Sequence, residues 1–189
     1  EPALEKLRGL HPQTKVKLLD LFPAEQIAAL REGKIDLALT EDGGNLPSRD
    51  FHVRKLAVTG SCASLPQDHP LASRRQIKVA DLKGETFIVA SDAEVPGSRS
   101  RLLRLCRRCG GFRPKMMEVP GGLPEAFSAI ANDGAVALLP AFLRHQKRPG
   151  MVILPVSDAA ATWDLAVVWP QGQKAKPLRT LLASLPFPE

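Results

Sequence analysis

The sequence predicts an α/β protein built from two small lobes, and three observations lead to that class. The chain has 189 residues, a length that suits one large domain or two small ones, and 44% of them are hydrophobic, which is close to the globular average. Short apolar runs of strand length alternate with amphipathic helical stretches, as in crossover units around a sheet. This alternation stops after residue 40 and begins again at residue 86, which predicts a second lobe.

The first part of the chain reads as one strand, helix, strand unit behind a short helix. Pro23 suits the first turn of a helix and Gly33 suits the position after its end. Brief links between such elements predict a crossover and a parallel sheet. The expected elements are a helix at 3–9, a strand at 16–19, a helix from Pro23 to Gly33 and a strand at 35–39.

The remaining elements follow a turn-rich stretch at 41–47. Residues 66–85 are expected to form a loop with one short helical turn, because they lack a sustained apolar period. The expected elements are one or two strands at 54–65, a strand at 86–90, a helix at 98–109, a strand at 115–119, a helix at 123–132, strands at 135–139, 151–154 and 165–169, and a helix at 177–185.

The cysteines and the apolar runs bound the type of protein. Cys62, Cys106 and Cys109 are too few, and odd in number, for a secreted disulfide framework, so reduced thiols in the cytoplasm are expected. No apolar run approaches the roughly 20 residues that cross a bilayer, so no membrane partner is expected. The chain opens at Glu1 without Met or an apolar leader, which is expected of a fragment of a longer protein.

The net charge of +6 is concentrated in one arginine-rich run. Phe112 is the one aromatic residue in that run, and the sequence has no zinc-finger spacing or evident helix-turn-helix, so a nucleic-acid interface is not predicted here. A solvated helix face and an anion-binding surface both remain open. The run comprises Arg99, Arg101, Arg104, Arg107, Arg108 and Arg113.

Motifs of catalysis and of metal or phosphate binding are missing from the sequence. The four histidines are far apart, and no G-x-S-x-G, Walker loop or G-x-G-x-x-G occurs. The glycine pairs Gly43-Gly44 and Gly121-Gly122 are interpreted as turns. We therefore expect a protein that is not an enzyme, with no catalytic residues, no metal site and no cofactor.

Two local features leave alternatives open. Cys106 and Cys109 form a C-x-x-C that indicates core packing or incidental thiols, or a sensing role if nearby arginines lower the thiol pKa. Ser98 is predicted to cap the helix that follows it, with Arg99 in the first turn. A cation there opposes the helix dipole, so either an anion compensates Arg99 or its side chain extends into water.

The chain resembles the effector-binding domain of LysR-type transcriptional regulators. The most specific stretch is SLPQDHPLA at 64–72 followed by VADLKGETFI at 79–88. Further landmarks follow in the family's order and cover nearly the whole chain: His11-Pro12, LREGKIDLAL at 30–39, LCRR at 105–108, GFRP at 111–114, ALLP at 137–140 and LAVVW at 165–169.

The resemblance implies two Rossmann-like lobes joined by two crossing strands, a type 2 periplasmic-binding-protein-like fold. Lobe I would comprise residues 1–64 and 159–189, and lobe II residues 65–158. A small-molecule effector would bind in the cleft between the lobes and modulate promoter binding. Promoter DNA would be contacted by an N-terminal winged helix-turn-helix absent from this chain, and the protein would be a homodimer or homotetramer.

The resemblance also implies which residues contact the effector. Many members have Ser or Thr where this chain has Phe22-Pro23, and Ser where it has Gly122. Two polar anchors for a carboxylate are thus missing, so the cleft is expected to be more apolar on that side. The expected effector-binding residues are Phe22, Pro23, Thr40, Ser91, Ser98, Arg99, Gly121 and Gly122.

Two other classes of protein share this architecture. An extracytoplasmic solute-binding protein of a transport system is the first alternative, and a signal peptide in the precursor would distinguish it. A two-lobe enzyme of the same superfamily is the second. It would need a concentrated set of nucleophile, acid and base, which the sequence does not provide.

Overall fold

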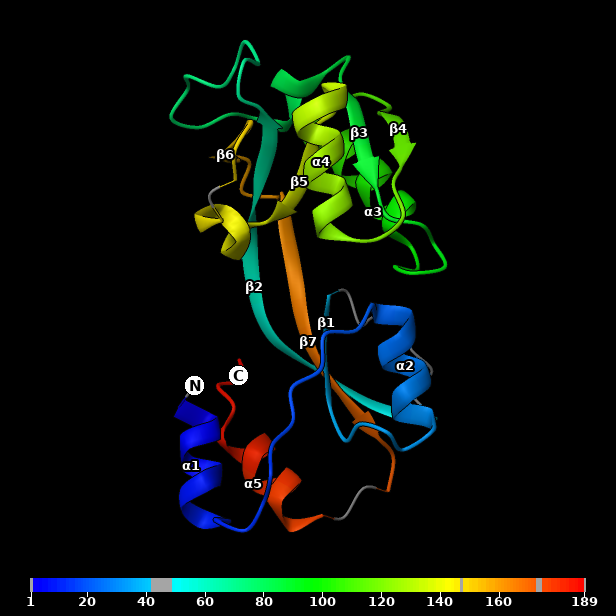
Figure 1. Cartoon of the computed structure of the whole chain (residues 1–189), viewed down its shortest axis with the longest axis vertical. Helices are drawn as coiled ribbons and strands as arrows, with labels where there is room; N and C mark the ends of the chain where they lie inside the picture. Colours follow the sequence, from blue (N-terminus) through cyan, green and yellow to red (C-terminus); the bar gives the residue numbers. More distant parts are fainter. Residues whose placement is uncertain (1, 42–48, 147, 173–174, 189) are drawn as a thin grey trace. The chain divides into compact units, whose positions relative to one another are not determined.

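The structure, a computed structural model, describes residues 2–41, 49–146, 148–172 and 175–188 (Figure 1). By its contacts the chain divides into unit 1, Glu1–Val58 with Asp164–Glu189, and unit 2, Thr59–Trp163. The chain passes between the units within two strands, β2 (Phe51–Pro66) and β7 (Thr162–Pro170). The lobe boundaries expected after residues 64 and 158 stay a prediction.

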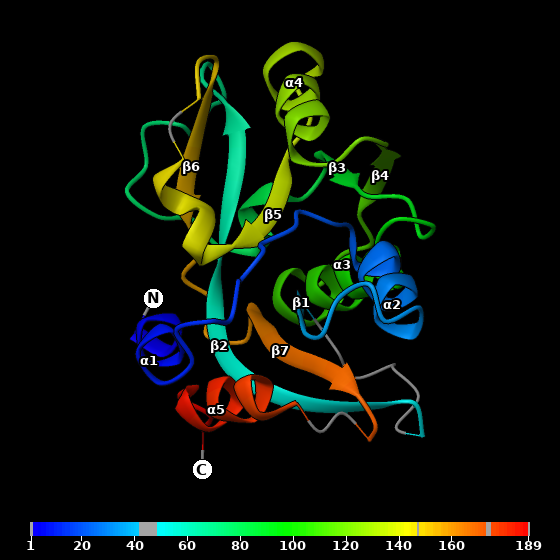
Figure 2. The same cartoon turned by 60° about the horizontal axis from the view of Figure 1, so that its bottom comes forward.

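Unit 1 contains the helices that the sequence predicted near both ends of the chain. They are α1 (Pro2–Leu10), α2 (Pro23–Arg31) and α5 (Lys176–Ser184). Helices α1 and α5 lie side by side in Figures 1 and 2, with Leu7 and Leu178 buried. His11 Nε2 lies 2.8 Å from Thr180 Oγ1 and ties the end of α1 to α5.

The strands of unit 1 differ from the prediction. Strand β1 (Ala38–Glu41) pairs antiparallel with β7, Thr40 facing Ala166. Residues 16–19 form no strand, and Val16, Leu18 and Leu19 are exposed. The predicted parallel strand, helix, strand unit is therefore wrong, because a short apolar run carries no information about the strand it would pair with. Most of the turn expected at 41–47, with Gly43-Gly44, lies outside the described residues.

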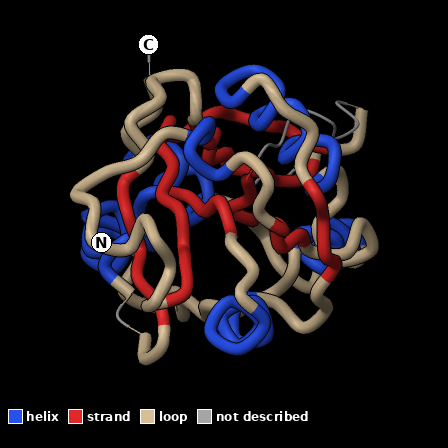
Figure 3. The backbone as a smooth tube through the Cα atoms, turned by 90° about the horizontal axis from the view of Figure 1, so that it is seen from above, coloured by secondary structure: helices blue, strands red, loops and turns tan. Residues whose placement is uncertain are grey.

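Unit 2 contains the predicted second alternation of strands and helices. Figure 3 shows the helices, strands and loops of the chain in separate colours. Strands β3 and β4 are parallel, with Thr86 opposite Lys115, and α3 connects them. Strand β2 pairs antiparallel with both β5 and β6. The elements are η2 (Val79–Leu82), β3 (Thr86–Val89), α3 (Ser98–Leu105), η3 (Cys106–Gly110), β4 (Lys115–Glu118), α4 (Leu123–Asp133), β5 (Ala137–Pro140), η4 (Ala141–His145) and β6 (Met151–Pro155).

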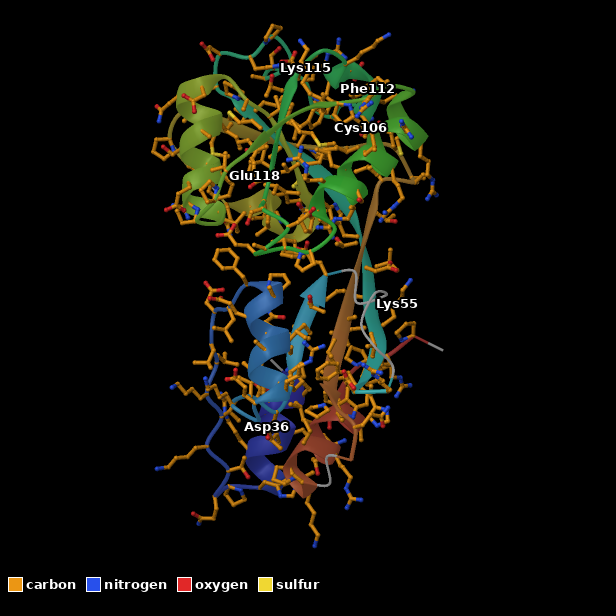
Figure 4. The ribbon with its side chains drawn as sticks, turned by 90° about the vertical axis from the view of Figure 1, so that its right-hand side faces the viewer. Asp36, Lys55, Cys106, Phe112, Lys115 and Glu118 are labelled. Carbon is orange, nitrogen blue, oxygen red and sulfur yellow. The ribbon has the colours of Figure 1, made fainter. Side chains whose placement is uncertain are left out.

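The core of unit 2 forms where η3 meets β3. The Phe87 and Phe112 rings lie with centroids 6.0 Å apart, and Cys106 is fully buried beside them in the same cluster (Figure 4). A Cβ at Gly110 would lie 2.4 Å from the Phe112 ring, so only glycine allows this close approach. The helix predicted at 98–109 is present as α3 followed by a π-helical turn, η3.

Candidate functional site

The eight residues that the sequence predicted to contact an effector fall in both units, close to strand ends and helix starts. Unit 1 holds Phe22, Pro23 and Thr40, and unit 2 holds Ser91, Ser98, Arg99, Gly121 and Gly122.

The start of α2 offers no side-chain hydroxyl. Phe22 occupies the N-cap position, and its N–H donates to Glu25 Oε2 at 2.8 Å. Pro23, the first helical residue, has no N–H to offer. A ligand at this helix start would therefore meet an aromatic ring and a pyrrolidine ring rather than hydrogen-bond donors.

Gln26, one turn into α2, was missed by the sequence analysis. Its Nε2 donates to Leu21 O at 3.0 Å, whereas its Oε1 is buried and has no hydrogen-bond partner among the described residues. Pro23 and Gln26 are three positions apart, so they lie on the same side of the helix. A buried acceptor without a partner costs free energy that a ligand donor would recover. The sequence signal that could have identified Gln26 is a polar amide side chain in the first turn of the predicted helix.

Thr40 is buried in β1. Its side chain lies on the same face as that of Ala38, and its Oγ1 donates to Glu41 O at a long 3.4 Å. The hydroxyl is thus mainly engaged with its own backbone, and that bond is weak enough to be exchanged for a better acceptor.

In unit 2, Glu94 joins two of the predicted residues. Ser91 Oγ donates to Glu94 Oε2 at 3.0 Å, and Gly121 N–H donates to Glu94 Oε1 at 3.1 Å. The Glu94 N–H also donates to Ser91 Oγ at 3.3 Å. The Glu94 carboxylate therefore accepts from both the Ser91 hydroxyl and the Gly121 N–H, the two donors that a ligand carboxylate would use here. Sequence reasoning missed Glu94, because nothing local indicates which distant loop its carboxylate meets.

Ser98 does not cap α3, which corrects the prediction. Gly97 is the N-cap residue, in a left-handed conformation with φ 81°, and Ser98 is the first helical residue. The buried Ser98 Oγ instead donates to Ala90 O at 2.7 Å and closes the loop between β3 and α3. The left-handed backbone needed to enter the helix favours glycine at the cap, which displaces the serine by one position.

Arg99 is exposed, and its Nη1 lies 3.3 Å from Glu118 Oε2 at the end of β4. A carboxylate of the protein itself thus compensates the cation in the first turn of α3. This is a third outcome, beside the bound anion and the free side chain that the sequence left open.

The start of α4 is built from glycine. Gly122 is the N-cap residue, and its O accepts from Ala126 N–H at 3.0 Å. Gly121 has φ 91°, and a Cβ there would lie 2.7 Å from Glu125 Cδ. The glycines therefore let the chain turn close to the Glu94 and Glu125 side chains, a position that a side chain at residue 121 would block.

The thiols do not have the lowered pKa that a sensing role requires. Burial raises the pKa of the Cys62 thiol to about 11 and that of Cys106 to about 12. The pKa of Cys109 is also raised, chiefly by burial. These shifts run opposite to the lowering that nearby arginines would cause, and at Cys109 burial and Asp158 outweigh Arg108.

The described residues contain neither a metal-binding cluster nor a membrane-spanning helix. Within them, no group of three or more His, Cys, Asp or Glu side chains is arranged to hold a metal ion. Among the same residues, no helix is both long and apolar enough to span a bilayer.

The sequence is similar to bacterial transcription regulators. It is 24% identical over 180 residues to the Hca operon transcriptional activator HcaR of Escherichia coli, covering 95% of this chain and 60% of that protein. It is 30% identical over 154 residues to the HTH-type transcriptional regulator MetR of Salmonella typhimurium, covering 80% of this chain and 46% of that protein. The chain thus spans about half of the length of these relatives, which are regulators rather than enzymes.

Solved structures share the fold across nearly the whole chain. The effector-binding domain of BenM with its effector benzoate matches with a TM-score of 0.77 at 18% identity, covering 97% of this chain and 82% of that one. CbnR, a LysR family transcriptional regulator, matches with a TM-score of 0.79 at 14% identity, covering 96% of this chain and 62% of that one. The fold is therefore the type 2 periplasmic-binding-protein-like one of LysR effector-binding domains, an α/β pair of Rossmann-like lobes joined by two crossing strands.

The family profile described as "LysR substrate binding domain" matches residues 1–185. That match covers the landmarks at 64–72 and 79–88 and both units of the structure. The chain belongs to the LysR substrate-binding domain family.

Proposed function

We propose that the chain is the effector-sensing domain of a LysR-type transcription regulator. The observation that carries the proposal is the family match over residues 1–185, together with relatives that regulate transcription. In the whole protein, an N-terminal winged helix-turn-helix outside this chain contacts promoter DNA. The protein acts in the cytoplasm as a homodimer or homotetramer.

The effector acts by binding one arrangement of the domain more tightly than another. A ligand that bound all arrangements equally would shift no equilibrium, however tight the binding. Effector binding then changes how the DNA-bound oligomer sits on its promoter.

The proposed contacts come from both units. In unit 1 they are Phe22, Pro23 and Thr40, joined by the Gln26 amide oxygen, which has no hydrogen-bond partner among the described residues. In unit 2 they are Ser91, Gly121 and Gly122, with Glu94 between them. Ser98 positions the loop before α3, and the Arg99 guanidinium contributes when it exchanges Glu118 for the effector.

The residues favour an effector with an apolar body and a hydrogen-bond donor. BenM binds benzoate, so aromatic carboxylates are the natural first compounds to screen. In this chain, however, Pro23 has no donor, and the Ser91 hydroxyl and Gly121 N–H are already satisfied by Glu94. Gln26 Oε1 and the Glu94 carboxylate are both hydrogen-bond acceptors and have no proton to donate, so amines, amides and hydroxylated aromatics fit better than simple acids.

A thermal-shift screen over aromatic and aliphatic acids, amino acids and neutral metabolites tests the function. Stabilisation follows RT ln(1 + [L]/Kd), so a 100-fold excess over Kd gives about 2.7 kcal/mol. A hit is then titrated by calorimetry into Thr40→Val and Gln26→Leu, with Ser184→Ala as a control remote from the proposed contacts. Loss of affinity in the first two and not in the third is expected. Equal affinity in all three would remove unit 1 from the site.

The transport alternative is not favoured. Both named relatives are transcription regulators, and the matching family is a regulator domain. Attaching the chain to a helix-turn-helix reader and measuring promoter occupancy with and without the effector separates the two functions. Occupancy that ignores the effector would contradict the regulatory proposal.

A further inference from the structure

An open groove in unit 2 shares Arg99 alone with the proposed effector contacts. It has a volume of about 280 Å³ and opens between α3 and the segment that leads into β4. Five of its six lining residues have no role in the proposed effector site. The lining consists of Arg99, Ser100, Leu103, Arg113, Pro114 and Met116. We refer to this cavity as the α3–β4 groove.

The groove has an apolar floor. Leu103 lies four positions after Arg99 and therefore on the same side of α3. Pro114 and Met116 are two positions apart, which places them on one face of the extended chain. Pro114 is buried, whereas Leu103 and Met116 are half-buried, and Met116 packs against the core cluster of unit 2. This floor offers hydrophobic contact to the body of a small molecule.

The two arginines of the groove differ in their partners. Arg99 is paired with Glu118, at the end of β4 opposite to Lys115 (Figure 4). Arg113 precedes Lys115 and lies beside the other end of the strand. In the part of the chain that the structure describes, Arg113 has no hydrogen bond and no ion pair. One end of the groove is thus compensated, and the other carries an unpaired guanidinium.

We propose that the α3–β4 groove is a second ligand site, which binds a small organic carboxylate with a short apolar body. Arg113 holds the carboxylate through two parallel N–H···O bonds, the arrangement that a guanidinium fork favours. Leu103, Pro114 and Met116 contact the apolar body. The volume of about 280 Å³ lies just below the usual 300–1,000 Å³ of ligand pockets, which suits a ligand smaller than a drug-sized molecule. Arg113, a member of the arginine-rich run that the proposed effector site does not use, thereby acquires a role.

The methionines provide a direct test. The chain contains three, Met116, Met117 and Met151, of which Met116 alone lines the groove. Met117 follows it on the opposite face of β4, and Met151 is buried in a separate cluster with Phe127. Hexanoate is titrated into protein with ¹³C-labelled methionine methyl groups, assigned with a Met116→Leu variant. The Met116 methyl resonance is expected to shift in a saturable way, with the other two unchanged.

Variants of the arginines and an uncharged ligand test whether Arg113 binds the carboxylate. Arg113→Ala is expected to weaken hexanoate about tenfold or more, the usual loss for a charge-assisted hydrogen bond. Arg107→Ala removes an exposed arginine of the same run outside the groove and should leave the affinity unchanged. Arg113→Lys keeps the positive charge but loses the planar guanidinium. Its affinity for hexanoate should lie between that of Arg113→Ala and that of Arg107→Ala. Circular dichroism checks that each variant folds.

Three results would overturn the proposal. They are hexanoate titrations that leave Met116 unmoved, equal affinity in Arg113→Ala and wild type, and hexan-1-ol binding as tightly as hexanoate. Thr40→Val, which belongs to the proposed effector site in unit 1, should not change the hexanoate titration. A result that contradicts the carboxylate site in the groove can therefore be distinguished from one that contradicts the proposed effector site.

Discussion

Glu94 and Gly121 are joined by a hydrogen bond of 3.1 Å between the Gly121 N–H and Glu94 Oε1. The bond connects the loop before α3 to the loop before α4, and Ser91 binds the other oxygen of the same carboxylate. One acidic side chain thus fixes two loops that the sequence analysis had treated as independent ligand-binding elements.

Removing the Glu94 carboxylate should loosen the Gly121 amide. In Glu94→Ala the Gly121 N–H loses its acceptor, so we expect its hydrogen exchange, followed by NMR, to accelerate severalfold. Glu94→Gln keeps an amide oxygen and should exchange at an intermediate rate. Asp92→Ala, an exposed acid of the same loop, is the control and should behave as wild type. Unchanged exchange in Glu94→Ala would contradict the bridging role.

Gly121→Ala should destabilise unit 2 more than Gly97→Ala. Both glycines have positive φ, 91° and 81°, where an L-residue costs about 1–2 kcal/mol. A Cβ at Gly121 would also meet Glu125 Cδ at 2.7 Å, whereas a Cβ at Gly97 has open space. Urea denaturation measures both free energies of unfolding. Equal losses would show that the Glu125 side chain moves aside without cost.

Ser61→Ala should cost about 1–3 kcal/mol, because it leaves buried polar groups without partners. Ser61 Oγ donates to Ala161 O at 2.7 Å and accepts from Trp163 Nε1 at 2.9 Å. Urea denaturation gives the free energy, and a change in tryptophan emission reports the freed indole. Ser100→Ala, at an exposed serine, should stay within about 0.5 kcal/mol of wild type. A similarly small effect of Ser61→Ala would show that water replaces both bonds.

Stability should fall as the pH rises above 9. In the unfolded chain the thiols of Cys62 and Cys106 release their protons near pH 9, whereas in the folded protein burial raises their pKa values to about 11 and about 12. The contribution of these two thiols to the free energy of unfolding is complete below pH 9. It is lost as the pH rises through the pKa values of the folded protein. Each buried thiol contributes a slope of about 1 kcal/mol per pH unit within that window.

Urea denaturation between pH 8 and pH 11 measures this slope. Cys62→Ala should flatten the curve relative to wild type, because one of the two thiols no longer titrates. Iodoacetamide at pH 8 should label Cys109 before Cys62 and Cys106, since Cys109 is partly exposed and the other two are buried. Rapid labelling of Cys106 in the folded protein would contradict its burial.

The sequence alone identified most helices and the strand, helix, strand order in unit 2. Pro and Gly mark the ends of α2, and the alternation at 86–119 became β3, α3 and β4. These signals are local, because a proline removes a donor and a helix repeats every 3.6 residues wherever it lies. The order of the family landmarks likewise needed no coordinates to indicate the LysR substrate-binding domain.

Tertiary structure decided what depends on contacts between distant segments. The run at 16–19 was apolar enough to be predicted as a strand in the same sheet as β1. In the structure, β1 pairs instead with β7 from the other end of the chain. Glu94 meets Gly121, and Arg99 meets Glu118, across 27 and 19 residues of sequence. The periodicity of the sequence determines which face of a helix or strand is apolar. The partner of a strand edge, of a carboxylate or of a guanidinium is determined only when distant segments fold together.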